Sequence, residues 1–307
     1  MSDTRPVRER SWDAGRPVDL RATLSQLRRG AGDPAHRFDA AGRFWWACAT
    51  PDGDGTLSVS VTGTRVRALA WGAGADWLLE RVPALLGDSD DWSDLDVSSM
   101  PVLQDVLRRN AGFRLARTGL VLDALVPAVL EQKVTGQEAR RSWRLLLQRF
   151  GSVAPGPVAG LRVPPAPRVL LDLPTWDWHR IGVDAKRQRA IRAAASVARR
   201  LEECGSMTPA AAADRLRLIS GIGPWTVAET MQRALGDPDA VSVGDYHLPN
   251  MVVHVLTGRA RGTDEEMLEL LAPWAGQRQR VMRLIEMSGI SAPRYGPKFN
   301  YTDIRAI

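Results

Sequence analysis

Cysteine is scarce in this sequence, and its scarcity excludes several classes of protein. The 307 residues contain only two cysteines, Cys48 and Cys204. Two thiols are too few for a disulfide framework, a four-cysteine zinc site or a four-cysteine iron–sulfur cluster. We therefore expect no metal site in this protein.

Long apolar runs are also absent. No stretch reaches the ~18 apolar residues that a membrane-spanning helix requires. The first residues lead into charged positions rather than into the apolar run of a secretory signal. We predict a cytoplasmic protein without a membrane partner.

The residues that are present fit a globular protein with a basic surface. A length of 307 residues predicts one large domain or two modest ones, and 44% hydrophobic with 25% charged residues allows a substantial core. The net charge is only +6, but one segment concentrates it: Lys186, Arg187, Arg189, Arg192, Arg199 and Arg200. Such clustering favours a polyanion as partner. Composition alone does not decide whether this partner is nucleic acid.

The first third of the chain has a β pattern. Residues 1–17 are charged and lack apolar periodicity, which predicts a loose tail. From 43 to 70, alternating apolar and polar residues are separated by glycine-rich turns, as in a small antiparallel sheet, and 76–86 has helical periodicity. The acidic stretch 88–98 indicates a linker or loop. We predict a β-rich N-terminal domain, with its linker, over residues 18–98.

Residues 99–307 are predicted to be mostly helical. Apolar residues from 139 to 150 and from 191 to 201 recur with the period of a helix face. The proline-rich stretch 151–174 predicts an extended connection between helices. The expected fold class is therefore α+β, with a predominantly helical body after a small antiparallel sheet and helix.

Within this helical part, two helices are joined by a tight glycine turn. A threonine and a proline at 208–209 give a good helix start, and Pro224 opens the second helix. Gly221 and Gly223 permit a sharp turn that Ile222 anchors in the core. Backbone N–H groups at a helix N-terminus attract phosphate. The same tripeptide can also merely join two packed helices, and by itself it favours that interpretation.

The surrounding motifs make the turn more specific. They are residues 126–135, the hairpin at 218–228, Val243-Gly-Asp-Tyr and Ala272-Pro-Trp-Ala-Gly. With them the sequence resembles the helix-hairpin-helix DNA glycosylases, most closely the 3-methyladenine DNA glycosylase II branch, over residues 120–288. The N-terminal pattern is similar to the small β-rich domain of that branch.

This resemblance implies a function and its partners. It implies an enzyme of base excision repair that hydrolyses the N-glycosidic bond of a damaged, alkylated base. The implied partner is double-stranded DNA containing damaged bases, bound by a monomer that associates with the nucleoid. No cofactor is implied as a requirement, although a monovalent cation can sit at the hairpin when DNA is bound.

By the same resemblance Asp245, which lies 20 residues after Trp225, matches the catalytic aspartate of the family. Breaking an N-glycosidic bond builds positive charge on the deoxyribose, and a fixed carboxylate stabilises that charge or orients the attacking water. The alternative is that Asp245 caps a helix beginning at Tyr246. The two roles are compatible, and spacing alone favours the cap.

Trp225 stands where members of the superfamily that also cut the DNA strand carry a lysine. An amine is needed there to form a Schiff base with the sugar. The tryptophan therefore implies a monofunctional glycosylase that leaves an abasic site. Its ring would stack on a flipped, electron-poor base, or it would simply cover the hairpin as a core residue.

The remaining pocket residues depart from the family pattern. Glu229, one turn after Trp225, and Tyr246 are expected in the substrate pocket, but residues 277–289 contain no aromatic where the branch usually has one. The preferred lesion therefore stays open. His247 and His254 are weaker candidates, because a lone histidine on a helix is more often structural.

A second DNA contact is expected between two helices. Lys133 and Val134 match the stretch that fills the gap left by a flipped base. The sequence does not fix which of the two residues is the wedge. An interior helical turn explains the same residues equally well.

Three alternatives compete with this function. A non-catalytic helix-hairpin-helix DNA-binding protein would keep the hairpin, but it would have no need of Asp245. A glycosylase for oxidised or mismatched bases would share the reaction and differ in its pocket. A zinc deaminase is excluded, because its His-x-Glu and Pro-Cys-x-x-Cys ligand pattern is missing.

Overall fold

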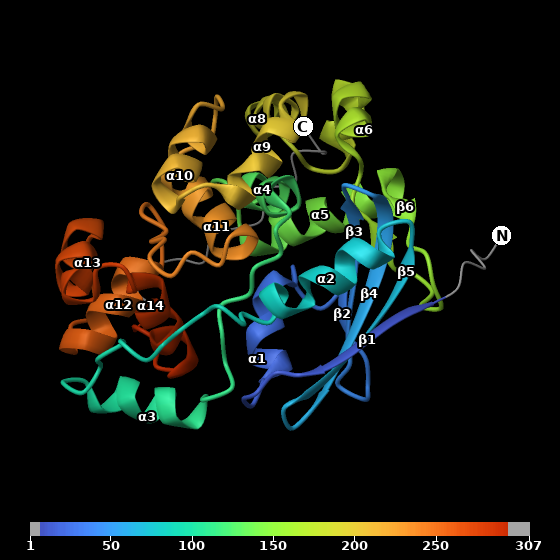
Figure 1. The fold of residues 1–307 in the computed structure, drawn as a ribbon. Coiled ribbons are helices and arrows are strands. Elements are labelled where there is room, and N and C mark those ends of the chain that lie inside the picture. The colour runs from blue at the N-terminus through green and yellow to red at the C-terminus, as the bar shows by residue number, and fades with distance from the viewer. Residues whose placement is uncertain (1–6, 294–307) are drawn as a thin grey trace.

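The chain folds into an antiparallel sheet beside a larger body of helices (Figure 1). The structure is a computed structural model and describes residues 7–293. The sheet has five strands in the order β1-β5-β4-β3-β2. Their bounds are β1 (Arg8–Asp13), β2 (His36–Phe38), β3 (Phe44–Thr50), β4 (Gly53–Thr62) and β5 (Arg65–Gly72). The predicted α+β class is confirmed.

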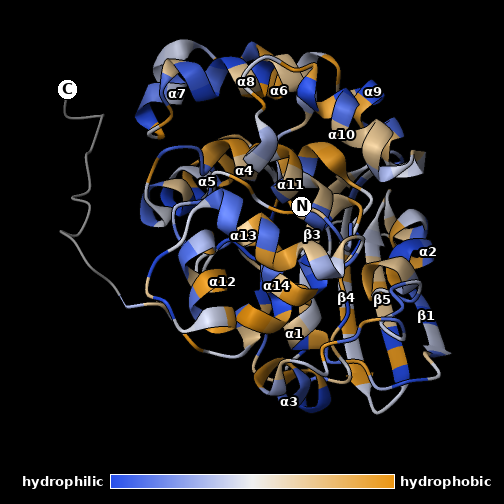
Figure 2. Ribbon diagram, turned by 90° about the vertical axis from the view of Figure 1, so that its left-hand side faces the viewer, coloured by the Kyte–Doolittle hydropathy of each residue, from blue (hydrophilic) through white to orange (hydrophobic). Residues whose placement is uncertain are grey.

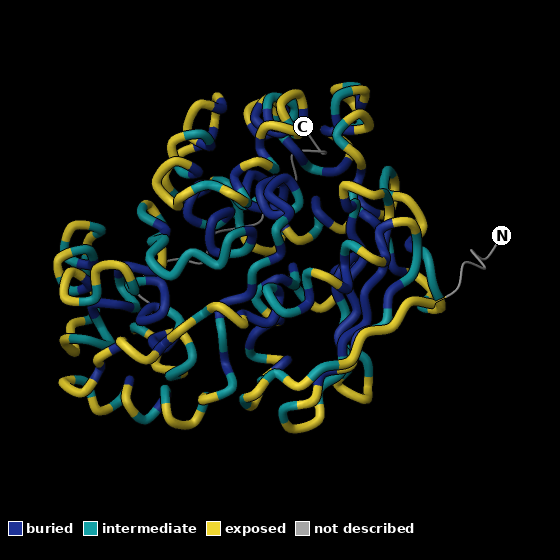
Figure 3. Tube along the Cα trace, in the orientation of Figure 1, coloured by how far each residue is buried: buried dark blue, intermediate teal, exposed yellow. Residues whose placement is uncertain are grey.

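One face of the sheet forms the core of the N-terminal part. Helices α1 (Leu20–Leu24) and α2 (Ala75–Leu85) pack against this face, and the inner strands are buried along much of their length (Figure 3). The alternation seen in the sequence places its apolar residues on that face: Phe44, Trp46, Cys48, Leu57, Val59, Val66, Ala68 and Ala70.

The prediction of a loose tail over residues 1–17 is wrong for part of that segment. Arg8–Asp13 form strand β1, which pairs antiparallel with β5 at the edge of the sheet. All of its residues except Trp12 are exposed. An edge strand of this kind needs backbone partners rather than an apolar face, so its sequence shows no apolar periodicity. Residues 1–6 lie outside the described part of the chain.

The helices fall into two groups, each with its own apolar core. Within the described residues, no helix is long and apolar enough to cross a membrane. The first group is built on α4, which is hydrophobic and buried along nearly its whole length (Figure 2). Its helices are α4 (Val121–Leu130), α5 (Gly136–Phe150), α6 (Pro167–Asp172), α7 (Thr175–Arg180), α8 (Ala185–Ser196), α9 (Ala198–Glu202), α10 (Pro209–Arg217) and α11 (Pro224–Ala234).

The second group brings the end of the chain back to an earlier segment. It consists of α3 (Pro101–Arg109), α12 (Leu248–Thr257), α13 (Asp264–Leu271) and α14 (Arg278–Met287). Residues 88–98 have no helix or strand, as a loop or linker should, but they are packed into this group through Trp92, Leu95 and Val97. Asp90 also forms a buried ion pair with Arg280 of α14. The acidic stretch is therefore part of the helical core.

The proline-rich stretch 151–174 is less extended than predicted. It contains a two-stranded ribbon, β6 (Ser152–Val153) and β7 (Arg162–Val163), followed by α6. Pro167 occupies the first turn of α6, where a missing N–H breaks no helical hydrogen bond. The ribbon packs beneath β3 and so ties the sheet to the first helical group.

A buried polar cluster joins the sheet region to the helices. Asp33 accepts hydrogen bonds from the indole N–H of Trp143 on α5 (3.0 Å) and from the backbone N–H of Arg29 (2.6 Å). Burial by itself would raise the pKa of Asp33, but the charge and hydrogen bond of His36, together with backbone N–H donors, lower it to about 2. The two regions therefore share a polar interface as well as apolar contacts.

Asp123 of α4 lines a small cavity in the same cluster, and we predict that it destabilises the fold at neutral pH. Burial, against the opposing charge of His36, raises its pKa from 3.8 to about 6. The folded state thus holds this proton more tightly than the unfolded chain, and stability falls as pH rises from about 4 to about 6. Asp123→Asn should raise the free energy of unfolding at pH 8 by up to about 3 kcal/mol, and change it little at pH 4.

Urea denaturation at the two pH values measures this difference. Asp88→Asn, at an exposed position, is the matched control and should leave the pH dependence of stability unchanged. An equal gain from Asp123→Asn at both pH values would contradict the assignment.

Candidate active site

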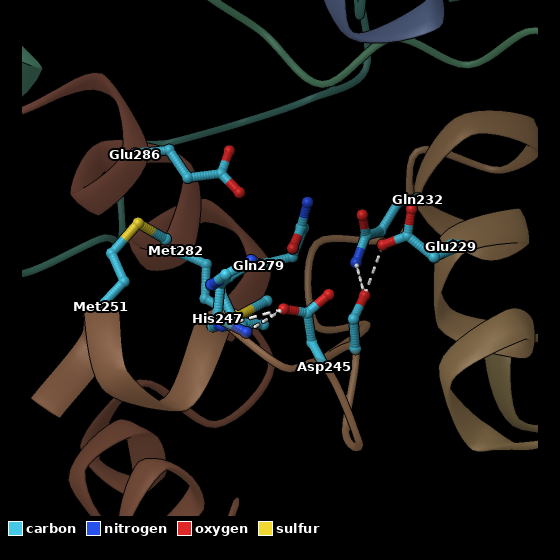
Figure 4. Close-up of a pocket in the computed structure, with 10 residues that line it drawn as sticks. Glu229, Gln232, Asp245, His247, Met251, Gln279, Met282 and Glu286 are labelled. Carbon is cyan, nitrogen blue, oxygen red and sulfur yellow. Dashed lines mark hydrogen bonds between the residues drawn. The ribbon is translucent and has the colours of Figure 1, made fainter. Parts of the chain in front are cut away.

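A polar pocket lies where the two helical groups meet (Figure 4). Its volume is about 160 Å³. One wall comes from α11 of the first group, and the other comes from α12 and α14 of the second. The lining residues are Glu229, Gln232, Ser242, Asp245, His247, Leu248, Met251, Gln279, Met282 and Glu286.

Asp245 is held rigidly at the edge of this pocket. Its Oδ1 accepts hydrogen bonds from the backbone N–H groups of His247 (2.8 Å) and Leu248 (2.9 Å) at the start of α12. The helix begins at Leu248 rather than at Tyr246 as predicted, and the carboxylate bridges the intervening turn. The N-cap is therefore His247 and not Asp245 as the sequence suggested, although Asp245 still accepts from the amides that open the helix.

Trp225 fixes the other oxygen of the same carboxylate. Its indole N–H donates a hydrogen bond of 3.1 Å to Oδ2 of Asp245. Trp225 is half-buried in the first turn of α11 and is not one of the residues that line the pocket. The tryptophan thus connects the first helical group to the aspartate of the second.

Glu229 lines the pocket but has both oxygens occupied. Oε2 pairs with Arg233 (2.8 Å), and Oε1 accepts from the hydroxyl of Ser242 (2.7 Å). Ser242 in turn accepts from the side-chain amide of Gln232 at 3.0 Å. Glu229 therefore belongs to a closed polar network across the pocket wall.

The other predicted pocket residues are more peripheral. Tyr246 is 71% exposed, with its ring edge-on to that of His247. His247 lines the pocket, whereas His254 lies outside it and has Nδ1 3.0 Å from the carbonyl oxygen of Arg259. The described part of the chain contains no group of three or more His, Cys, Asp or Glu side chains arranged to hold a metal ion.

The glycine hairpin has the predicted geometry. Thr208 caps α10, the turn follows, and Pro224 opens α11. Gly221 has a φ of +88°, Ile222 is buried, and both glycines are exposed. The backbone at this turn therefore faces solvent beside the N-terminus of an eleven-residue helix.

The turn between α4 and α5 is hydrogen-bonded to this hairpin. The side-chain amide of Gln132 donates to the carbonyl oxygen of Gly221 (3.0 Å) and to the hydroxyl of Thr226 (2.8 Å). Lys133 is exposed with a φ of +53°, the only positive φ of a non-glycine residue in the described part of the chain, and Val134 is half-buried. These residues form an interhelical turn, so the alternative of an interior helical turn is wrong.

Sequence reasoning missed several of the residues that the fold gathers. Gln132 lies next to Lys133 in the motif but had no assigned role. Gln279, Met282 and Glu286 are spaced as one face of α14, at i, i+3 and i+7. The signal in the sequence was a glutamine on the buried face of that helix.

Comparison with solved structures identifies the fold. No family model matches the sequence, and no curated protein matches it significantly. A 3-methyladenine DNA glycosylase from Archaeoglobus fulgidus has a similar structure, with a TM-score of 0.73 at 14% identity, over 91% of this chain and 98% of that one. The chain has the helix-hairpin-helix DNA glycosylase fold.

Two further structures with this fold are similar. MBOgg1, solved with a low-affinity DNA ligand, gives a TM-score of 0.71 at 15% identity over 92% of this chain and 97% of that one. An 8-oxoguanine glycosylase/lyase from Clostridium acetobutylicum, solved with DNA, gives 0.68 at 11% identity over 92% and 96%. The glycosylase fold therefore extends over the N-terminal sheet as well as the helices.

The two glycines of the glycosylase hairpin should differ in their tolerance of a side chain. At Gly221 an added Cβ would require a positive φ and lie 2.9 Å from the Cβ of Ala190, whereas at Gly223 it would meet nothing within 4 Å. Gly221→Ala should lower the free energy of unfolding by about 1–3 kcal/mol. Gly223→Ala, the matched control, should leave it nearly unchanged. Urea denaturation of both variants tests this difference, and equal stabilities would contradict it.

Proposed function

We propose that this protein is a DNA glycosylase of base excision repair that acts as a monomer on double-stranded DNA. The observation that carries the proposal is the carboxylate of Asp245, oriented by three hydrogen-bond donors at the edge of a pocket. A flipped base would occupy that pocket, and the carboxylate would lie beside its sugar. The fold supports the proposal, because the structures it resembles are those of DNA glycosylases.

Asp245 would stabilise the positive charge that develops on the deoxyribose, or orient the attacking water. Its donors are backbone amides and an indole, so the carboxylate is already positioned before the reaction and needs little rearrangement. In this proposal Trp225 is a positioning residue for Asp245. Because Trp225 carries no amine, the enzyme would be monofunctional and leave an abasic site.

DNA would be held from two neighbouring turns. The amides around Gly221 and Gly223 would bind phosphate at the start of α11, where a monovalent cation could also contribute. Lys133 is the better wedge candidate of the pair, because it is exposed and holds a backbone conformation that costs free energy, whereas Val134 is half-buried. The hydrogen bonds of Gln132 would fix the position of the two turns relative to each other.

The base removed would be an alkylated one, as the sequence resemblance implies. The similarity to the Clostridium acetobutylicum 8-oxoguanine glycosylase/lyase supports an oxidised base as the second candidate. Duplexes bearing one defined lesion each, scored for abasic sites, separate the two candidates. A non-catalytic DNA-binding protein would produce no abasic sites on any of them.

Asp245→Asn tests the proposed chemistry. The asparagine Oδ1 can still accept from His247 and Leu248, so the helix start should be kept, while loss of the hydrogen bond from the Trp225 indole should lower the melting temperature only slightly. Loss of the negative charge should slow single-turnover excision by on the order of 10²-fold or more. Binding of DNA should survive or tighten, because an anion leaves a DNA-facing site. Full activity of a folded variant would overturn the assignment of Asp245.

Trp225 gives a separate prediction about strand cleavage. Without an amine at this position, borohydride should trap no covalent adduct between the enzyme and its DNA substrate. Alkaline treatment should be needed to cut the strand after base removal. A trapped adduct would contradict the monofunctional assignment while leaving the glycosylase proposal intact.

A further inference from the structure

The pocket lacks the residues that commonly hold a base by its faces. Among the residues that line it there is no tryptophan, tyrosine or phenylalanine. The imidazole of His247 is the one ring in this lining, so stacking and cation–π attraction, which hold a base without regard to its edge, are supplied less than in an aromatic pocket. Selection must come from hydrogen bonds and charge.

Gln279 is the first side chain available for this purpose. It is only 3% exposed, and its backbone N–H donates to the carbonyl oxygen of Pro238 (2.8 Å). Its side-chain amide has no hydrogen-bond partner among the residues that the structure describes, and it points into the pocket (Figure 4). Because the amide reaches the pocket and has no protein partner, both its donor and its acceptor groups are available to a ligand there.

Glu286 lies two turns farther along the same face of α14. Its Oε2 pairs with Arg283, whose guanidinium also lies over the ring of Phe113. Oε1 has no hydrogen-bond partner among the described residues, and 38% of the side chain is exposed at the pocket. In contrast to Glu229, whose two oxygens are both occupied, Glu286 keeps one acceptor free for a ligand.

The charges around Glu286 come from three elements. Desolvation by the protein packed around Glu286 raises its pKa, and so do the charges of Glu229 of α11 and Asp245; Arg283 and Arg233 oppose the rise. His247 also lines this side of the pocket. A ligand that donates hydrogen bonds, and more so one that carries positive charge, would relieve the repulsion between the carboxylates.

We propose that Gln279 and Glu286 are the specificity-determining residues of this pocket, and that they select a purine lesion whose edge presents N–H donors. The proposal rests on the proposed glycosylase function and names the base that the site takes. Hydrogen bonds to a carboxylate are stronger than neutral ones, and they strengthen further when the base is cationic. A base without donors leaves the carboxylate of Glu286 unpaired and can only accept from the amide of Gln279, so it is disfavoured.

Three lesions in one duplex sequence test the proposal by single-turnover excision. They are 7-methylguanine, which is cationic and has N–H donors; hypoxanthine, which is neutral with one N–H donor; and 1,N6-ethenoadenine, whose etheno bridge removes the donors from that edge. The wild-type protein should remove them in that order of rate. Glu286→Gln and Gln279→Leu should each reduce the preference for the first two over ethenoadenine by about 10-fold or more.

The control variant is Glu269→Gln. It removes the same charge from an exposed position on α13, outside the pocket, and should leave all three rates unchanged. The wild-type preference should also grow as pH rises through the ionisation of Glu286, and Glu286→Gln should abolish that step. A merely structural role for Glu286 would not produce this pH-dependent change.

Two results would overturn the proposal. Folded Glu286→Gln and Gln279→Leu variants with wild-type preference would show that other residues select the base, while the glycosylase proposal would stand. A wild-type protein that removes none of the three bases would overturn this proposal, whereas the glycosylase proposal would fall only if a duplex bearing an oxidised base also gave no abasic sites. Melting temperatures of both variants establish that they are folded, and the two sites give independent tests.

Discussion

The carboxylate of Asp245 is the point on which the rest of the candidate site depends. One oxygen accepts from the first amides of α12, and the other accepts from Trp225 of α11. The aspartate therefore joins the two helical groups at the place where their separation leaves a pocket. Because both oxygens are already paired within the protein, the carboxylate is fixed before any ligand arrives, which suits electrostatic stabilisation of a developing charge.

Some of the arginines stabilise the fold. In the arginine-rich segment, Arg187 is 4% exposed and donates to the carbonyl oxygen of Leu130. On α14, Arg280 pairs with buried Asp90, and Arg283 pairs with Glu286. The pair between Arg280 and Asp90 holds α14, and with it one wall of the pocket, against the segment 88–98. Lys186, Arg189, Arg199 and Arg200 of the arginine-rich segment are exposed.

Helix α14 contributes polar side chains, and no tryptophan, tyrosine or phenylalanine, to the lining of the pocket. Arg283 forms an ion pair with Glu286, which lines the pocket. Gln279, one turn before Arg283, adds an amide without a partner among the described residues. A pocket of this kind selects by the edge of its ligand, whereas an aromatic pocket selects by the face.

The sequence by itself determined the features that rest on local periodicity and turn chemistry. Alternation fixed the buried face of the sheet, and Thr208, the two hairpin glycines and Pro224 fixed the two helices and the turn between them. Contacts between residues that are far apart in the sequence were decided only by the tertiary structure. They are the hydrogen bond from the Trp225 indole to Asp245, that from Gln132 to the hairpin, and the position of α14 opposite Glu229. Strand β1 is a further example. Its residues are mostly exposed and show no apolar pattern, and it forms because its backbone pairs with the free edge of β5. Local patterns follow from helix and strand geometry, but pairing of distant groups depends on how separate cores pack, and no spacing in the sequence records that.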